Sequence, residues 1–127
     1  GFQKSVEDFF DKLKERYPDY TYDIEISPDK IENTTLQISI FRIIQEACNN
    51  AVVHSKGNVL QVKFKKEAND YYLFIKDNGI GFQGEAEHKS NHYGLSIMKE
   101  RAQLLGGKLD IQSDERGTKI TVRIPIS

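Results

Sequence analysis

The sequence lacks the features that mark a secreted, membrane-spanning or strongly charged protein. It contains a single cysteine, Cys48, so no internal disulfide can form, which suits a reducing compartment. No apolar run approaches the length of a membrane span, and no signal-peptide pattern opens the chain. The net charge is −1, which gives no general reason to expect nucleic acid or an anionic membrane as a partner.

Several signatures of known chemistry are also missing. There is no Gly-x-x-x-x-Gly-Lys-Ser/Thr, because residues 106–108 (GGK) are followed by leucine. No Gly-x-Gly-x-x-Gly follows a first strand, and no serine occupies a Gly-x-Ser-x-Gly elbow. His88 and His92 are four residues apart but have no carboxylate at metal-ligand spacing, so we interpret them as loop residues. The sequence gives no support to these classes of site.

What is present is the composition of one globular domain. The chain has 127 residues, 38% of them hydrophobic and 29% charged, which allows a core without disulfides or metals. A helical apolar stripe begins already at Phe2. We therefore expect a single domain over residues 1–127, excised from a longer protein.

The pattern of apolar residues predicts the order of helices and strands. We expect helices at about 2–16, 35–55 and 95–105, and strands at about 20–26, 59–64, 71–75, 108–112 and 118–124. Residues 83–92 have only Ala86 as an apolar side chain, which predicts a mobile loop. This order favours an α+β fold, a two-layer α/β sandwich whose mixed sheet is covered on one face by three helices.

The long central helix carries polar residues at a regular spacing. Arg42, Glu46, Asn50 and His54 recur every four residues and fall on one face. The Asn50 oxygen suits Mg²⁺, and Glu46 could orient water or accept a proton. A solvated polar stripe on a surface helix would give the same pattern. Asn49 beside them argues modestly against that alternative, because asparagine is a poor helix former.

A second polar segment, residues 77–82 (DNGIGF), follows the strand expected at 71–75. Asp77 offers one fixed carboxylate, and the backbone at Gly79 and Gly81 has no side chain to hold a flat ligand away. An aspartate before Asn-Gly is also a common turn residue. A hairpin, however, would be followed at once by another strand. Here a polar loop follows, which indicates that the glycines open a cavity.

Two further segments complete the pattern. Gly94 and Leu95 lie at the predicted start of the third helix, where unpaired backbone N–H groups and the helix dipole can bind an anion. A tight turn would explain this glycine equally well. Gly117 and Thr118 lie between the last two strands, where a simple hairpin is the alternative. Each segment alone is weak, but the ordered set indicates an ATP site.

In this order the segments resemble the ATP-binding catalytic domain of sensor histidine kinases, in the superfamily that includes gyrase, Hsp90 and MutL. The resemblance covers essentially the whole chain and rests on residues 42–46 (RIIQE), 50–51 (NA), 54–55 (HS), 77–82, 93–102 (YGLSIMKERA), 105–107 (LGG) and 117–125 (GTKITVRIP). It is closest to the branch typified by the nitrate sensor and the membrane-fluidity sensor. It implies the Bergerat ATP-binding fold.

The resemblance implies a role for each residue around the adenine. Asp77 would accept a hydrogen bond from the adenine amino group, and Thr118, beside Gly117, would support it directly or through water. Gly79 and Gly81 would let the backbone close over the base.

It implies a second set of residues around the phosphates. Asn50 would hold Mg²⁺ bridging the phosphates, and Glu46 would be the catalytic base or water-orienting group. His54 would lie against the nucleotide. Gly94, followed by Leu95, would start the helix that faces the phosphates.

The sequence departs from the family pattern at two places. Val53 stands where relatives commonly carry lysine or arginine, and Arg42 or Lys99 could supply the missing charge. The ATP lid implied at about 83–93 lacks its usual first glycine, with Asn91 near that place. Both departures bear on catalytic rate more than on nucleotide binding.

The implied function is to bind Mg-ATP and donate its γ-phosphoryl group to a histidine on the protein's own upstream dimerisation domain, which is not in this chain. A LuxR-type response regulator would act downstream. We expect a cytoplasmic location, as the C-terminal domain of a membrane-anchored sensor, with no contact to nucleic acid or membrane. One alternative is a serine kinase of the anti-sigma-factor type. Another, favoured by Val53, is a nucleotide-gated binding module with weak or no catalysis.

Overall fold

The computed structural model describes residues 1–27, 31–79 and 85–126. Along the chain they form α1 (Phe2–Arg16), β1 (Thr21–Ile26), α2 (Thr34–His54), β2 (Val59–Glu67), β3 (Asp70–Asp77), α3 (Glu85–Leu104), β4 (Lys108–Asp114) and β5 (Gly117–Pro125). The predicted order of helices and strands is confirmed. No helix in the described ranges is both long and apolar enough to cross a membrane.

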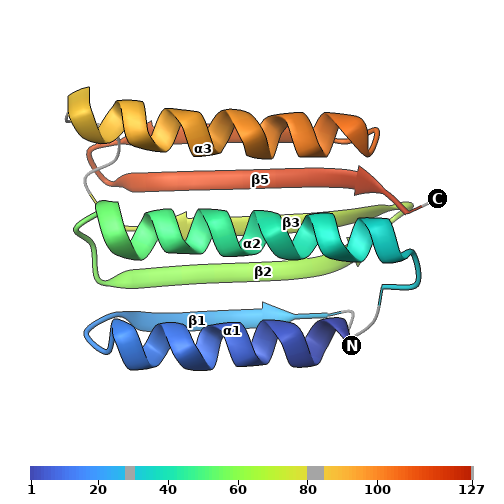
Figure 1. Ribbon diagram of the computed structural model, residues 1–127, viewed down its shortest axis with the longest axis horizontal. Coiled ribbons are helices and arrows are strands. Elements are labelled where there is room, and N and C mark those ends of the chain that lie inside the picture. Colours follow the sequence, from blue (N-terminus) through green and yellow to red (C-terminus); the bar gives the residue numbers. More distant parts are fainter. Residues whose placement is uncertain (28–30, 80–84, 127) are drawn as a thin grey trace.

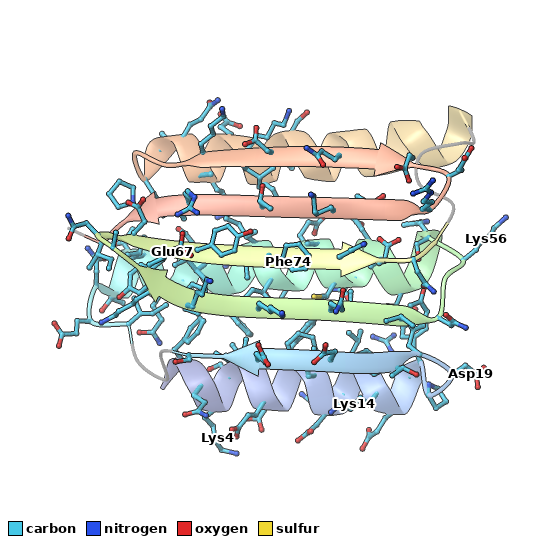
Figure 2. The ribbon with its side chains drawn as sticks, turned by 180° about the vertical axis from the view of Figure 1, so that it is seen from behind. Lys4, Lys14, Asp19, Lys56, Glu67 and Phe74 are labelled. Carbon is cyan, nitrogen blue, oxygen red and sulfur yellow. The ribbon has the colours of Figure 1, made fainter. Side chains whose placement is uncertain are left out.

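The strands form one mixed sheet in the order β1-β2-β3-β5-β4. β1 pairs in parallel with β2, and the other neighbours pair antiparallel. Figure 1 shows the three helices on the same face of this sheet, and Figure 2 shows the opposite face, where Phe74 lies. The predicted two-layer α/β sandwich with a mixed sheet is confirmed.

Local chemistry explains where the elements begin and end. α1 buries Phe2, Val6, Phe10 and Leu13, which recur at helical spacing, and it ends before Pro18, which disfavours helix at the residue preceding it. The hairpin between β2 and β3 is tighter than expected, because the polar residues 67 and 70 still pair with each other across the turn.

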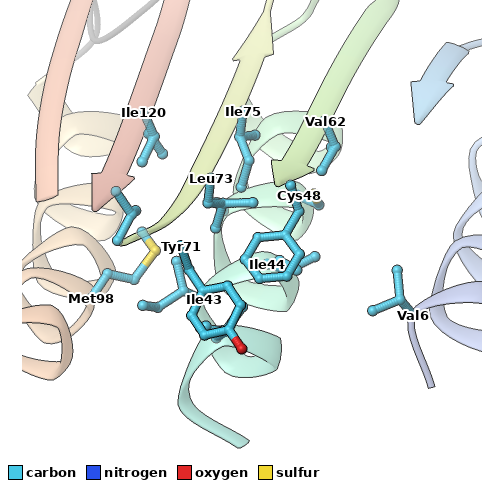
Figure 3. Close-up of a cluster of buried hydrophobic side chains, with 14 of the residues drawn as sticks. Val6, Ile43, Ile44, Cys48, Val62, Tyr71, Leu73, Ile75, Met98 and Ile120 are labelled. Atoms are coloured by element: carbon cyan, nitrogen blue, oxygen red, sulfur yellow. The ribbon is translucent and has the colours of Figure 1, made fainter. Parts of the chain in front are cut away.

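The core lies between the sheet and the helices. Figure 3 shows Ile43 and Ile44 of α2 facing Leu73 and Ile75 of β3, and all four side chains are at most 2% exposed. Cys48 is fully buried among them, and burial raises the pKa of its thiol. Cys48 therefore packs as a small hydrophobe, as the helical pattern predicts.

One prediction about the fold is wrong. The third helix begins at Glu85, not near residue 95. Residues 85–92, which were predicted to belong to a loop over 83–92, are therefore helical. Residues 83 and 84 lie outside the described part. The segment 85–92 has only Ala86 as an apolar side chain, but it contains glutamate, alanine and lysine, which favour helix. A helix that is polar on all sides gives no periodic signal, so the pattern was misinterpreted.

Candidate functional site

The polar face of α2 forms one wall of the candidate site. The Asn33 side chain caps the helix by accepting from the Leu36 N–H at 3.0 Å, which sets the start of the regular spacing. Ile40, Ile44, Ala47 and Ala51 face the core, whereas Glu46 is exposed and Asn50 is half-buried. The predicted pair Glu46 and Asn50 therefore projects from the same side of the helix, one turn apart.

A cavity of about 510 Å³ separates this face of α2 from α3. It is lined by Arg42, Gln45, Glu46, Asn49 and Asn50 of α2 and by Gly94, Ile97, Met98 and Arg101 of α3. This volume lies within the range of pockets that hold small molecules and cofactors. The cavity combines acidic, amide and guanidinium groups, which suits a ligand that carries phosphates and a metal ion.

Gly94 brings α3 close to this polar face. A Cβ atom built on Gly94 would meet the Glu46 carboxylate and would lie 3.4 Å from Nδ2 of Asn50. The absence of a side chain is therefore what allows the backbone of α3 to approach both residues.

Asn50 has an unsatisfied donor in this contact. Its Nδ2 atom is buried and has no hydrogen-bond partner among the described residues. An unpaired buried donor typically costs about 1–3 kcal/mol, so buried amides are almost always paired. An orphaned amide in a polar cavity fits a site whose remaining partner is a bound ligand.

Asp77 forms a second, separate part of the site at the end of β3. It is 6% exposed, and its Oδ1 accepts from the backbone N–H of Gly79 at 2.9 Å and of Thr118 at 3.4 Å. Oδ2 accepts no hydrogen bond from the described residues. Burial raises the pKa of Asp77, although the two backbone donors oppose that shift.

β5 approaches Asp77 through a glycine. Gly117 has φ +133°, a conformation that L-residues rarely adopt, and a Cβ there would collide with the Asp77 carbonyl. The next residue, Thr118, is buried and pairs with Asp77 across the sheet. The predicted juxtaposition of Asp77, Gly117 and Thr118 is thus present in the structure.

The turn after Asp77 packs against the connection between α2 and β2. The Asn78 Oδ1 accepts from the backbone N–H groups of Asn58 and Val59 at 2.8 and 2.9 Å. A Cβ on Gly79 would collide with the Ser55 carbonyl. The turn is therefore fixed from both sides, by β5 and by this connection.

The structure corrects the expectation for Gly94. Gly94 and Leu95 lie in the interior of α3, not at its start, because the helix begins at Glu85. Their N–H groups therefore cannot be the free donors of a helix N-terminus. Gly94 still reaches the site, but as a point of close contact with Glu46 and Asn50.

The remaining predicted site residues either do not line the 510 Å³ cavity or lie outside the described residues. Gly81 lies outside the described residues. His54 is half-buried at the last residue of α2 and is not among the residues that line the 510 Å³ cavity. Gly117 and Thr118 line a smaller cavity of about 190 Å³, together with Lys76 and Lys119. The structure thus brings the Asp77 group together and the Glu46 group together, but not into one cavity.

The sequence-based analysis missed two residues in these contacts. Arg101 lines the cavity, whereas the alternative source of charge, Lys99, does not. Seven residues separate Gly94 from Arg101, so helical spacing would have placed them on one face had Gly94 been assigned to a helix interior. Ser55 carries the contact with Gly79. The resemblance includes Ser55 in the segment 54–55 but assigns it no role.

Comparison with known proteins identifies the family. Residues 35–127 match the family described as histidine kinase-, DNA gyrase B-, and HSP90-like ATPase. The chain belongs to this family. The family model covers both halves of the site, since Glu46 and Asp77 fall within it, and nucleotide use follows from this membership.

Two curated relatives agree with the predicted kinase branch. The chain is 34% identical over 128 residues to the sensor histidine kinase LiaS of Bacillus subtilis, covering 99% of this chain and 34% of LiaS. It is 37% identical over 89 residues to the nitrate/nitrite sensor protein NarQ of Escherichia coli, covering 68% of this chain and 16% of NarQ. The predicted resemblance to sensor histidine kinases is confirmed, and the chain spans about a third or less of the length of these relatives.

The fold is also found in a solved structure. The Acinetobacter baumannii histidine kinase AdeS superposes with a TM-score of 0.79 at 16% identity, covering 99% of this chain and 65% of that one. At this identity the similarity supports the fold, and it agrees with the layers and sheet order described above.

Proposed function

We propose that this chain binds Mg-ATP and donates the γ-phosphoryl group to a histidine on an upstream dimerisation domain of the same protein. The observation that carries the proposal is the meeting of Glu46 and Asn50 with Gly94 in one polar cavity, where the buried Nδ2 of Asn50 has no hydrogen-bond partner among the described residues. A nucleotide that spans from Asp77 to this cavity would contact both halves of the site.

Each half of the site has a distinct task in this proposal. Asp77 would recognise the adenine amino group through Oδ2, which accepts no hydrogen bond from the described residues, while Oδ1 is held by backbone donors. Gly79, Gly117 and Thr118 would support the base from either side, as would Gly81. His54 would lie against the nucleotide at the end of α2.

At the phosphate end, Asn50 would hold Mg²⁺, whose charge neutralises the phosphates when it is bound. Glu46, exposed to the cavity, would accept the proton of the incoming histidine or orient it. Gly94 and Leu95 would place the backbone of α3 beside the phosphates, and the segment of about 83–93 would act as the lid. Transfer then depends on positioning and charge more than on covalent chemistry by this chain.

The partners follow from the same proposal. The acceptor histidine would lie on a dimerisation domain outside this chain, and a response regulator of the LuxR type would take the phosphoryl group onward. The relatives are named as sensor proteins. These names support a proposed cytoplasmic position for this domain within a membrane-anchored sensor. The net charge of −1 gives no general electrostatic reason to expect nucleic acid as a partner.

A radiolabelling assay tests the proposal. The chain is incubated with γ-labelled ATP alone, then with its upstream domain added, and label on the acceptor is measured. We expect label only when the acceptor is present, and none with Asn50→Asp, because an added negative charge repels the triphosphate. Label stably retained on the chain alone would contradict the assignment of the acceptor to another domain.

One observation favours a second candidate function. Val53 is 51% exposed on α2 and brings no charge to the position where relatives carry a cation. A module that binds nucleotide and transfers phosphate slowly or not at all would tolerate this valine. Val53→Lys separates the two functions: a gain in phosphotransfer at unchanged ATP affinity identifies an impaired kinase, and no gain identifies a binding module.

A further inference from the structure

We propose that Tyr20 is a positioning residue for adenine recognition, acting through the turn at residues 77–79. The inference rests on the proposed role of Asp77 in binding adenine. Tyr20 lies just before β1. It is distant in sequence from every polar segment that defines the site, and its hydroxyl contacts the end of α2 and the connection from α2 to β2.

The Tyr20 hydroxyl is the centre of a small hydrogen-bond network. It donates to the Ala51 carbonyl at 3.1 Å, lies 2.7 Å from Ser55 Oγ, and accepts from the Gly57 N–H at 3.1 Å. The Gly57 N–H is shared with Ser55 Oγ at 3.2 Å. Because a phenol has one proton, donation to Ala51 leaves Ser55 as the donor in the hydroxyl pair. The last turn of α2 and the connection to β2 are thereby tied to one side chain.

This connection is what holds the turn after Asp77. A Cβ on Gly79 would collide with the Ser55 carbonyl, and Asn78 accepts from Asn58 and Val59. Gly79 in turn donates to Oδ1 of Asp77 at 2.9 Å. Figure 1 shows the start of β1, the end of α2 and the end of β3 at the same end of the sheet. A shift of Ser55 is thus transmitted through Gly79 to the carboxylate.

A second tyrosine, Tyr22 of β1, provides a matched control. Tyr22 is also half-buried, and its hydroxyl donates to the Tyr17 carbonyl at 2.9 Å and the Leu13 carbonyl at 3.3 Å. These bonds tie β1 to the end of α1 and include no residue of the connection between α2 and β2 or of the turn at residues 77–79. Tyr22→Phe therefore removes a comparable hydroxyl with comparable hydrogen bonds and leaves the turn at residues 77–79 untouched.

The expected effect follows from the population of the competent turn. Without the Tyr20 hydroxyl, the connection and the turn spend part of the time displaced, and the apparent affinity falls in proportion to the fraction that stays in place. If removing these contacts destabilises the competent turn by a net amount equivalent to one hydrogen bond, the Kd for ATP should rise about threefold to tenfold. The preference for ATP over GTP should fall with it, because the displaced carboxylate no longer selects the adenine amino group.

The experiment measures ATP and GTP binding by calorimetry, and denaturant unfolding, for the wild-type chain, Tyr20→Phe, Tyr22→Phe and Ser55→Ala. We expect the two tyrosine variants to lose similar stability, while only Tyr20→Phe and Ser55→Ala lose ATP affinity and ATP preference. The double variant Tyr20→Phe/Ser55→Ala should bind no more weakly than the weaker single variant, because both hydroxyls hold the same connection.

The outcomes separate this inference from the proposed function. If the wild-type chain does not bind ATP, the proposed function is refuted. If the wild-type chain binds ATP and Tyr20→Phe binds it with unchanged affinity, the positioning role alone is refuted. The same holds if Tyr22→Phe loses as much ATP affinity as Tyr20→Phe. If Tyr20→Phe does not fold, Ser55→Ala decides, and unchanged ATP affinity in that variant overturns the inference.

Discussion

Replacing Asp77 by asparagine should weaken ATP binding without weakening the fold. Oδ1 of Asp77 is held by the N–H groups of Gly79 and Thr118, so the asparagine must keep its oxygen at that position. Its Nδ2 then occupies the place of Oδ2, which we assign to the adenine amino group. Two donors would face each other in a site where Asp77 is only 6% exposed.

The magnitude follows from this geometry. A buried donor left without an acceptor costs about 1–3 kcal/mol. The Kd for ATP should therefore rise roughly 5- to 150-fold. GTP carries an oxygen where ATP carries the amino group, so Asp77→Asn should bind GTP better relative to ATP than the wild-type chain does.

The stability of this variant should change in the opposite direction. The pKa of Asp77 is raised by burial above its ordinary value of 3.8. Between that value and the raised pKa, the folded chain binds the proton more tightly than the unfolded chain, so stability falls as pH rises through this window. At neutral pH the buried charge therefore costs stability, and the uncharged Asp77→Asn should be as stable as wild type or more so. The difference should shrink as the pH falls below the raised pKa.

The pKa shift also predicts how ATP binding depends on pH. Protonated Asp77 presents a donor, so ATP affinity should fall as pH decreases through the raised pKa, and Asp77→Asn should lack this component. Calorimetric titrations of ATP and GTP from neutral to acidic pH, with denaturant unfolding in parallel, measure both effects. Asp110→Asn, an exposed carboxylate on β4, is the matched control. Unchanged ATP affinity and ATP/GTP ratio in Asp77→Asn would refute the adenine assignment, and a large loss of stability at neutral pH would refute the account of burial.

Two further variants test the phosphate end of the site. Arg101→Met should raise the Kd for ATP about tenfold or more, because Arg101 lines the cavity and hydrogen bonds to charged groups contribute about 1.5–3 kcal/mol. The same variant should leave adenosine binding unchanged. Lys99→Met removes the same charge from an exposed position outside that cavity and should bind ATP normally; equal losses in both variants would indicate a general charge effect. Gly94→Ala should keep or gain stability, since alanine favours helix and the neighbouring Glu46 side chain is exposed and can move. Its phosphotransfer to the added acceptor domain should fall, and intact transfer would show that the position of Glu46 beside Gly94 does not matter.

The sequence sufficed to predict the order of helices and strands and the mixed sheet, because those features follow from local patterns. The pattern of apolar residues predicted the strand at 71–75, and the four-residue spacing of Glu46 and Asn50 predicted a shared helix face. The start of α3 could not be predicted, because residues 85–92 have only Ala86 as an apolar side chain and give no periodic signal, although several of them favour helix. That error also misplaced Gly94 at a helix start and hid Arg101 from the site.

Contacts between segments distant in sequence were beyond reach for a different reason. Nothing in residues 20 and 55 taken separately predicts that their hydroxyl groups lie 2.7 Å apart, since this depends on the parallel pairing of β1 with β2. Periodicity specifies which face a residue occupies, but not which residue of another element it meets. Tertiary packing supplies that information, and it is where the positioning role of Tyr20 becomes visible.

The two halves of the site are built to different degrees of rigidity, and this bears on how a nucleotide would bind. The adenine half is fixed by backbone hydrogen bonds to Asp77 and by the packing of Gly79 and Gly117 against neighbouring backbone. The phosphate half depends on the approach of one helix to another at Gly94, beside the Nδ2 of Asn50, which has no hydrogen-bond partner in the part of the chain that the structure describes. Adenosine affinity should therefore depend on the first half alone, whereas binding of the phosphates requires α2 and α3 to adjust around them. A nucleotide that satisfies the amide of Asn50 would favour the adjusted arrangement, so that recognition of the base precedes alignment of the phosphates for transfer.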